Sequence, residues 1–296
     1  METFPILLGR RALITGSIGW DMGAAIAITL AKNRVNIVLN FSPHRATMND
    51  DLDWKLKRLV EEISTYDSEV VLMQTDTRFE DEVGKMVEEI ISNKRAIDIL
   101  VNNGGGGWAG QDFTRTDFQT YEKAFSSETR SASNCIAACL PLMRDNHWGR
   151  IVNIGFTRVF ILSSRIREEP FASSWVNDWA SPRLGEHWPL IMNHGVGSWI
   201  LGDAGNLLLD VNSMRAEQRN NITINSISLG PGWIERWEDI YNPLDGYNIS
   251  NSVDDDRSGL EKAYSQLRTV ANTVLFFCSE QAKFITGAEI YVHQMD

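Results

Sequence analysis

Short apolar runs alternate with amphipathic stretches along most of this chain. The apolar runs are rich in β-branched residues and lie at Ala12–Ile14, Val35–Leu39, Glu69–Gln74, Ile97–Val101, Arg150–Ile154, Ile222–Ile227 and Glu289–Val292. Helical patterns lie between them at Ala24–Leu30, Leu52–Tyr66, Asp81–Ser92, Thr116–Asp145 (a helix pair), Gly202–Gln218 and Ser258–Ser279. Continuous apolar runs are typical of parallel strands that are buried on both faces. The alternation therefore predicts an α/β fold, a Rossmann-like doubly wound seven-stranded parallel sheet with helices on both faces.

No linker, internal repeat or low-complexity tract divides the sequence. Hydrophobic residues make up 43% of it, which is ample for one large core. We therefore expect residues 1–296 to form a single domain.

The charge balance is acidic, with 39 Asp and Glu against 28 Lys and Arg and a net charge of −11. This balance argues against nucleic acid or an anionic membrane as the main partner. There is no secretory segment and no apolar run of membrane length, so we expect a soluble, cytoplasmic protein. Cys135 and Cys139 lie one helical turn apart on an apolar segment, which favours buried thiols, and we predict no metal site.

A glycine-rich turn follows the first predicted strand. Gly16, Gly19 and Gly23 lead directly into the first predicted helix. A strand, a glycine-rich turn and a helix in this order direct the helix amino terminus and free backbone N–H groups at an anion. The glycines let the backbone approach a pyrophosphate closely, although this spacing differs from the usual dinucleotide fingerprint.

The end of the second predicted strand is where such folds contact the adenosine ribose. An acidic residue there would bind the 2′-hydroxyl of NAD. This sequence has Ser42, His44 and Arg45 instead, which suit a 2′-phosphate and hence NADP(H). The alternative is an exposed turn that serves only solubility.

Further motifs in the same order complete a resemblance to the short-chain dehydrogenase/reductase family over nearly the whole chain. They are Thr15-Gly16 with Gly19 and Gly23, Asp76, Asn102-Asn103-Gly104-Gly105, Gly149-Arg150-Ile151-Val152-Asn153-Ile154, Asn225, Pro231-Gly232 and Phe284-Ile285-Thr286-Gly287. The resemblance implies a nicotinamide cofactor bound across the carboxyl ends of the strands. It also implies homodimers or homotetramers that pair through Tyr121–Met143 and Gly202–Met214.

The same resemblance implies a set of cofactor-binding residues. They are Gly16, Ser17, Ile18, Gly19, Met22, Gly23, Ser42, His44, Arg45, Asp76, Thr77, Asn103, Gly104, Gly105, Ile154, Pro231, Gly232, Trp233 and Ile234.

The residues that the family normally uses to donate a proton are absent from their usual region. Members of the family reduce carbonyls with a Ser, a Tyr and a Lys shortly after the Tyr, and the Lys lowers the pKa of the Tyr. Here no Tyr occurs between Tyr121 and Tyr241, and no Lys occurs between Lys123 and Lys262. The usual Tyr and Lys positions fall on Trp199 and Asp203, and Glu128 takes the position of the family's helix Asn.

A long insertion at about residues 156–198 follows the fifth predicted strand. Insertions of this length in compact domains are commonly lids or binding loops. It carries several Trp residues among acidic side chains, which suits a planar cation such as an indole with an iminium group. The alternative is a loop that stays solvated.

This combination resembles fungal members of the family that act in indole alkaloid biosynthesis. They lack the Tyr and Lys, keep NADP(H), and couple imine or iminium reduction to Diels–Alder or Pictet–Spengler cyclisation. The resemblance implies an acid on the insertion, beside a Pro and ahead of a Trp, with an Arg on the long helix. The matching residues here are Glu169, Trp175 and Arg130, while Asp178 and Glu168 are alternative acids.

Three functions remain open from the sequence. The first is an NADP(H)-dependent enzyme that reduces or cyclises a small cationic indole substrate. The second is a nucleotide-binding regulator or scaffold that has lost catalysis. The third is a carbonyl or enoyl reductase that uses Tyr241 or Tyr247 as a relocated proton donor.

We predict that the protein binds NADP(H) more tightly than NAD(H), because Ser42, His44 and Arg45 stand where an acid would select NAD. One charge-assisted contact with the 2′-phosphate contributes about 1.5–3 kcal/mol. Isothermal titration calorimetry with both cofactors measures the difference, and equal affinities would contradict the prediction.

Overall fold

The computed structural model describes residues 7–17, 22–43, 50–92, 96–103, 130–156, 217–229 and 257–292. The strands are β1 (Arg11–Ile14), β2 (Asn36–Phe41), β3 (Val70–Gln74), β4 (Ile99–Asn102), β5 (Gly149–Phe156), β6 (Ile222–Leu229) and β7 (Glu289–Val292). The helices are α1 (Met22–Ala31), α3 (Asp50–Ser64), α4 (Glu80–Ser92), α6 (Ser131–Asp145), α13 (Arg257–Cys278) and the short 3-10 turn η6 (Glu280–Ala282).

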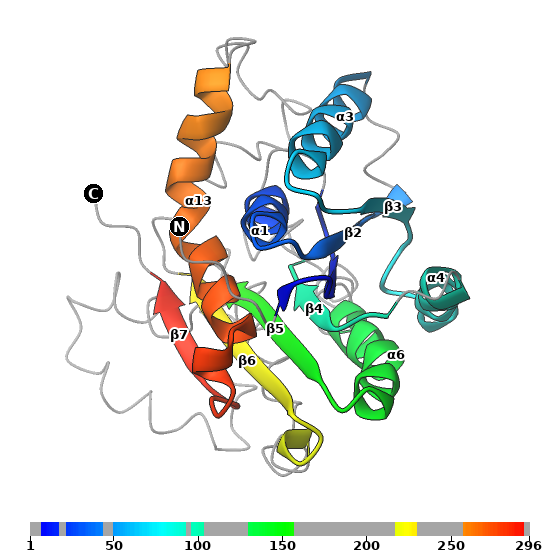
Figure 1. Cartoon of the computed structure of the whole chain (residues 1–296). Helices are drawn as coiled ribbons and strands as arrows, with labels where there is room; N and C mark the ends of the chain where they lie inside the picture. Colours follow the sequence, from blue (N-terminus) through cyan, green and yellow to red (C-terminus); the bar gives the residue numbers. More distant parts are fainter. Residues whose placement is uncertain are drawn as a thin grey trace, which may run out of the picture.

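The strands form one seven-stranded sheet in the order β3-β2-β1-β4-β5-β6-β7, and every neighbouring pair is parallel. The order reverses between β1 and β4, where the two halves of a doubly wound fold meet. This confirms the predicted fold class. Figure 1 shows the sheet crossing the molecule, with helices on both of its faces.

Alternate residues of the strands pack into two separate hydrophobic cores, one on each face of the sheet. Ala12 and Ile14 face α1 and α13, whereas Leu13 faces α4 and α6. The first core also includes α3, which packs on α1 through Leu59 and Ile63. Because both faces of the central strands are covered, most of their residues are apolar, which is why their sequences show continuous runs rather than alternation.

Four strands run past the carboxyl ends that their apolar patterns predict, including β2 to Phe41 and β4 to Asn102. β5 extends to Phe156 and β6 to Leu229, with Phe156 and Leu229 in register. Ser228 interrupts the apolar run of β6, yet its hydroxyl donates to a carboxylate oxygen of Glu289 on β7. A polar side chain that finds a partner in the next strand does not end a strand.

The predicted helix pair at 116–145 is described only from Arg130 onward. α6 contains Pro141 at an exposed position and continues to Asp145. None of the helices in the described part of the chain combines the length and apolar character needed to cross a bilayer.

Buried and charged side chains gather at the amino-terminal edge of the sheet, opposite the carboxyl ends of the strands. The guanidinium carbons of Arg10 and Arg150 lie 4.1 and 4.4 Å from the ring centroid of Trp148. Arg10 also pairs with Asp98 at 2.8 Å. Burial lowers the pKa of Arg150 below its ordinary value. These contacts join β1, β4 and β5 at the edge away from the candidate site.

The three cysteines are free and buried, as the sequence predicts for Cys135 and Cys139. Among the described residues, no cluster of His, Cys, Asp and Glu is able to hold a metal ion. Burial raises the pKa of Cys135 and of Cys278 to about 12, and that of Cys139 well above its usual range.

We predict that the folded protein resists thiol reagents at pH 8. A thiol with a pKa of about 12 is ionised there only to about one part in ten thousand, and the thiolate is the reactive form. Absorbance of a thiol-specific reagent should show labelling of Cys135, Cys139 and Cys278 only at the rate of unfolding, and promptly in guanidinium chloride. Prompt labelling of the native protein would contradict this packing.

Candidate cofactor site

The turn after β1 is folded by backbone contacts to its two neighbouring strands. Gly16 has a φ of 71°, a left-handed conformation that disfavours residues with a side chain. The N–H of Thr15 donates to the carbonyl of Val101 on β4, and the N–H of Ser17 donates to that of Asn40 on β2, both at 3.0 Å. The turn is thus fixed from both sides before the chain enters α1.

Gly23 lies inside the first turn of α1, because the helix begins at Met22, earlier than predicted. A Cβ at Gly23 would lie 2.8 Å from the Cβ of Ser17 and 3.1 Å from the Nδ2 of Asn103. The absence of a side chain therefore lets the helix pack directly on the turn and on the loop after β4. This is the role of a glycine that allows close helix–strand packing in dinucleotide-binding folds.

Thr15 and Asn103 connect the ends of β1 and β4. The backbone N–H of Asn103 donates to the Thr15 hydroxyl, and its side-chain amide donates to the Thr15 carbonyl, both at 3.1 Å. These bonds lie where the strand order reverses, the place at which ligands bind in open parallel sheets.

A buried amide connects the ends of β2 and β3. Asn40 is 2% exposed, and its Nδ2 donates to the carbonyls of Thr75 at 3.0 Å and Met73 at 3.3 Å. The N–H of Thr75 donates to the Phe41 carbonyl at 3.0 Å. Ser42 follows β2 directly and is half-buried. Ser42, one of the residues predicted to contact the 2′-phosphate, therefore follows a strand end that these hydrogen bonds hold in place.

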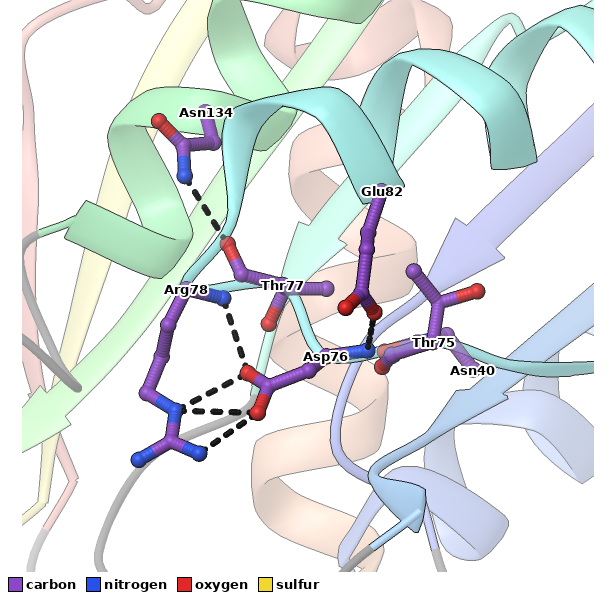
Figure 2. Close-up of polar contacts among 7 residues, drawn as sticks. All are labelled: Asn40, Thr75, Asp76, Thr77, Arg78, Glu82 and Asn134. Carbon is purple, nitrogen blue, oxygen red and sulfur yellow. Dashed lines mark hydrogen bonds and ion pairs between the residues drawn. The ribbon is translucent and has the colours of Figure 1, made fainter.

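The loop from β3 to α4 holds a cluster of polar contacts (Figure 2). The carboxylate of Asp76 accepts hydrogen bonds from the backbone N–H of Arg78 at 3.1 Å, from its Nε at 2.9 Å and from its Nη2 at 2.5 Å. These hydrogen bonds raise the pKa of Arg78 above its ordinary value. The N–H of Asp76 donates to Glu82 at 3.0 Å, and Asn134 of α6 donates to the Thr77 carbonyl at 3.1 Å.

The ends of β4 and β5 share a second buried amide pair. Asn102 donates to the Oδ1 of Asn153 at 2.7 Å, and the Oδ1 of Asn102 has no hydrogen-bond partner among the described residues. Ile154 is half-buried and packs against the core that contains α1 and α13. Arg130 is exposed at the start of α6, and its side chain makes no capping hydrogen bond within the part of the chain that the structure describes.

The other predicted site residues lie outside the described residues. For the cofactor these are Ile18, Gly19, His44, Arg45, Gly104, Gly105, Pro231, Gly232, Trp233 and Ile234. For catalysis they are Glu128, Glu169, Trp175 and Asp178, and the predicted insertion lies with them beyond Phe156.

A family model described as short chain dehydrogenase matches residues 10–159. The chain belongs to the short-chain dehydrogenase family. Members of this family are oxidoreductases that use a nicotinamide cofactor. The match covers the glycine turn, the β3–α4 loop and the ends of β4 and β5, where the polar contacts described above are gathered.

The chain is similar to one relative along its full length and to another along part of it, and a solved structure shares its fold. The chain is 25% identical over 294 residues to 3-oxoacyl-acyl-carrier-protein reductase FabG of Staphylococcus epidermidis, covering 97% of this chain and 98% of that protein. It is 32% identical over 124 residues to the short chain dehydrogenase claC of Passalora fulva, covering 41% and 42%. The structure of levodione reductase matches its fold with a TM-score of 0.67 at 19% identity, covering 97% and 96%.

Sequence reasoning missed Arg78, Asn40 and Asn134. Arg78 stands two positions after Asp76, and an Asp carboxylate often accepts a hydrogen bond from the backbone N–H at this spacing, so a signal existed. Asn40 directly follows the apolar run predicted at Val35–Leu39, and its carbonyl partners lie on another strand. The bond from Asn134 to Thr77 joins segments that are 57 residues apart, and nothing local in the sequence indicates it.

The described residues fit a dinucleotide. Gly16 turns the chain after β1, and Gly23 lets α1 pack closely on that turn. A pyrophosphate would gain hydrogen bonds from backbone N–H groups at the start of α1 and the favourable end of the helix dipole. Ser42, Asp76 and Thr77 follow strands on the β2–β3 side of the strand reversal, where they would hold the adenosine half.

Gly23→Ala should weaken NADP(H) binding, because the new Cβ on α1 would displace Ser17 and Asn103 and so disturb the turn after β1. Overpacking of this kind costs about 1–3 kcal/mol. Gly84→Ala is the control, since nothing lies within 4 Å of a Cβ at this position of α4. The control should gain about 0.5–1 kcal/mol in stability and keep its cofactor affinity. Calorimetry and thermal melts give both quantities, and normal binding by Gly23→Ala would contradict the fit.

Proposed function

We propose that this chain is an NADP(H)-dependent enzyme that acts on an imine or iminium intermediate containing an indole. It reduces this intermediate, directs its stereoselective cyclisation, or does both; the cyclisation is of the Pictet–Spengler or intramolecular Diels–Alder type. One observation carries the proposal. A chain of this family lacks any Tyr between Tyr121 and Tyr241 and any Lys between Lys123 and Lys262.

The absence of the Tyr and Lys matters because reduction of a carbonyl develops a negative charge on oxygen, whereas reduction of an iminium removes a positive charge. A carbonyl that accepts a hydride becomes an alkoxide and requires a proton, which the Tyr and Lys of the family supply. An iminium carbon that accepts a hydride becomes a neutral amine without a further proton, and a neutral imine takes its one proton from water to form that iminium. The nicotinamide, when bound, supplies that hydride. The enzyme then needs only to orient the cation and stabilise its charge.

Acidic and aromatic residues of the insertion are proposed to perform these tasks. Glu169 would hold the cation by its carboxylate, with Asp178 and Glu168 as the alternative acids, and Trp175 would stack on the indole. In a cyclisation the same carboxylate would accept the proton released when the indole regains aromaticity. Arg130 is exposed at the start of α6, and it would orient the acid or a substrate carbonyl.

NADP(H) is the cofactor that we propose for this chemistry. Ser42, His44 and Arg45 support the phosphorylated form, since none of them would repel a 2′-phosphate. The neutral Asn40 at the end of β2 supports it too, because no carboxylate stands there.

A second candidate function is carbonyl reduction. The relative that covers 97% of this chain is a 3-oxoacyl-acyl-carrier-protein reductase by name, and this favours a carbonyl substrate. The reaction would need a proton donor from elsewhere in the sequence, such as Tyr241 or Tyr247.

A parallel assay separates these functions. NADPH oxidation is followed at 340 nm, a standard wavelength for this cofactor, with a cyclic indole imine and with a 3-oxoacyl thioester. Turnover of the imine alone supports the proposal, and turnover of the thioester alone supports the carbonyl reductase. If NADPH binds and neither compound is consumed nor cyclised, a regulator or scaffold is the better account.

Glu169→Gln should lower the rate or stereoselectivity on the indole imine by about 10²–10³, by analogy with the loss of one oxyanion donor. The amide keeps the size of the side chain and removes the charge that holds the cation. NADP(H) affinity should stay nearly unchanged. Steady-state kinetics and chiral chromatography measure the effect.

Glu186→Gln, in the same insertion, is the matched control and should behave as the wild type. Full activity and selectivity of Glu169→Gln would exclude Glu169. Asp178 and Glu168 would then be replaced and assayed in the same way.

A further inference from the structure

Asn103 is followed by a glycine, and this is the single Asn-Gly pair in the 296 residues of the sequence. The side-chain amide carbon of an asparagine is open to attack by the backbone nitrogen of the next residue, which closes a succinimide ring. A glycine in that next position favours the attack, because it has no Cβ to crowd the nitrogen and its backbone turns freely. Asparagine is one of the heat-labile residues of proteins. Asn103 is therefore the asparagine of this chain with the greatest chemical reactivity.

The folded structure holds the side chain of Asn103 away from this reaction. Its Nδ2 donates to the Thr15 carbonyl and its backbone N–H donates to the Thr15 hydroxyl, both at 3.1 Å. The amide also lies close to α1, since a Cβ at Gly23 would be 3.1 Å from Nδ2. Ring closure requires the side chain to rotate toward the following peptide, and it breaks the bond from Nδ2, which leaves as ammonia. The reaction is therefore slow while β1 and β4 stay connected, and it proceeds when this connection opens.

The product of the reaction cannot restore the bond to Thr15. Water opens the ring and leaves either aspartate or isoaspartate, whose backbone is longer by one carbon atom. Both carry a carboxylate in place of the amide, so the donor is lost. In the aspartate form a carboxylate oxygen faces the Thr15 carbonyl, and two acceptors repel each other where the strand order reverses. The new negative charge would also repel the pyrophosphate of a dinucleotide.

We propose that Asn103 is a site of spontaneous deamidation, and that its conversion ends cofactor binding by this protein. The nitrogen of Gly104 forms a bond to Cγ of Asn103, ammonia leaves, and water opens the ring, so that no oxidant or reductant takes part. The effect on binding rests on the proposed function, which requires a dinucleotide, whereas the modification itself does not. A bound dinucleotide that keeps the connection between β1 and β4 closed slows the reaction, and the protein stays active for longer when its cofactor is present.

The first test follows the ageing of the full chain at mildly alkaline pH, with and without NADP+. Digestion and mass spectrometry measure, for every asparagine, the mass gain that accompanies replacement of NH2 by OH, and chromatography separates aspartate from isoaspartate. Asn103 should be converted first, and NADP+ at about a hundred times its Kd should slow this conversion by up to about a hundredfold. Gly104→Ala, read by mass alone, should also slow it, since the added Cβ crowds the attacking nitrogen.

The second test measures the consequence with a substitution that reproduces one product. Asn103→Asp should lower the affinity for NADP+ and for NAD+ by about tenfold or more in calorimetry, because a buried donor is replaced by an acceptor. Asn33→Asp is the matched control. Asn33 is 5% exposed, and its Nδ2 donates to the Thr29 carbonyl at 3.0 Å, before the amino end of β2. Both variants should melt at a lower temperature than the wild type, and Asn33→Asp should keep the wild-type affinity.

Three results would overturn the inference. Conversion of other asparagines ahead of Asn103 would show that it is not the reactive site. Equal rates with and without bound NADP+ would show that the reaction does not depend on opening of the connection between β1 and β4. Wild-type affinity in Asn103→Asp would show that the carboxylate does not disturb the cofactor. If the wild type binds no dinucleotide at all, the proposed function fails, and the mass measurement still tests the modification by itself.

Discussion

The hydrogen bonds between β1 and β4 are the constraint on which the rest of this structure depends. They join strands that are distant in the sequence, with Ile14 in register with Val101, and Thr15 and Asn103 continue the contact beyond the strands. After β1 the chain turns to α1 on one face, and the next described helix after β4, α6, covers the other face. The helices that follow the two strands therefore lie on opposite faces of the sheet, which is the arrangement at which open parallel sheets bind ligands.

Much of this arrangement could be predicted from the sequence, because buried parallel strands require apolar residues on both faces. Runs such as Ala12–Ile14 fix where strands lie, and glycines such as Gly16 fix where the backbone must turn or pack closely. Strand ends were less predictable. β6 continues through Ser228 because Glu289, on a strand far along the chain, accepts its hydroxyl.

The polar contacts of the candidate site were the least predictable part. Asn40 and Asn134 satisfy backbone carbonyls of Thr75 and Thr77, and these partners come together only after the sheet and α6 have formed. The catalytic assignments rest on a different kind of information, the absence of Tyr and Lys from a long stretch of sequence. That absence points to a substrate whose positive charge is already present, and it leaves the acid to be identified by substitution.

Transfer of deuterium from the cofactor tests the central claim most directly, namely that this chain delivers a hydride to an iminium without a Tyr proton donor. The protein is incubated with NADPH deuterated at the transferred position of the nicotinamide and with a cyclic indole imine, and the product is analysed by mass spectrometry and NMR. The account predicts one deuterium at the former imine carbon. A reduced, uncyclised amine without deuterium, or deuterium transfer to a ketone only, would contradict it.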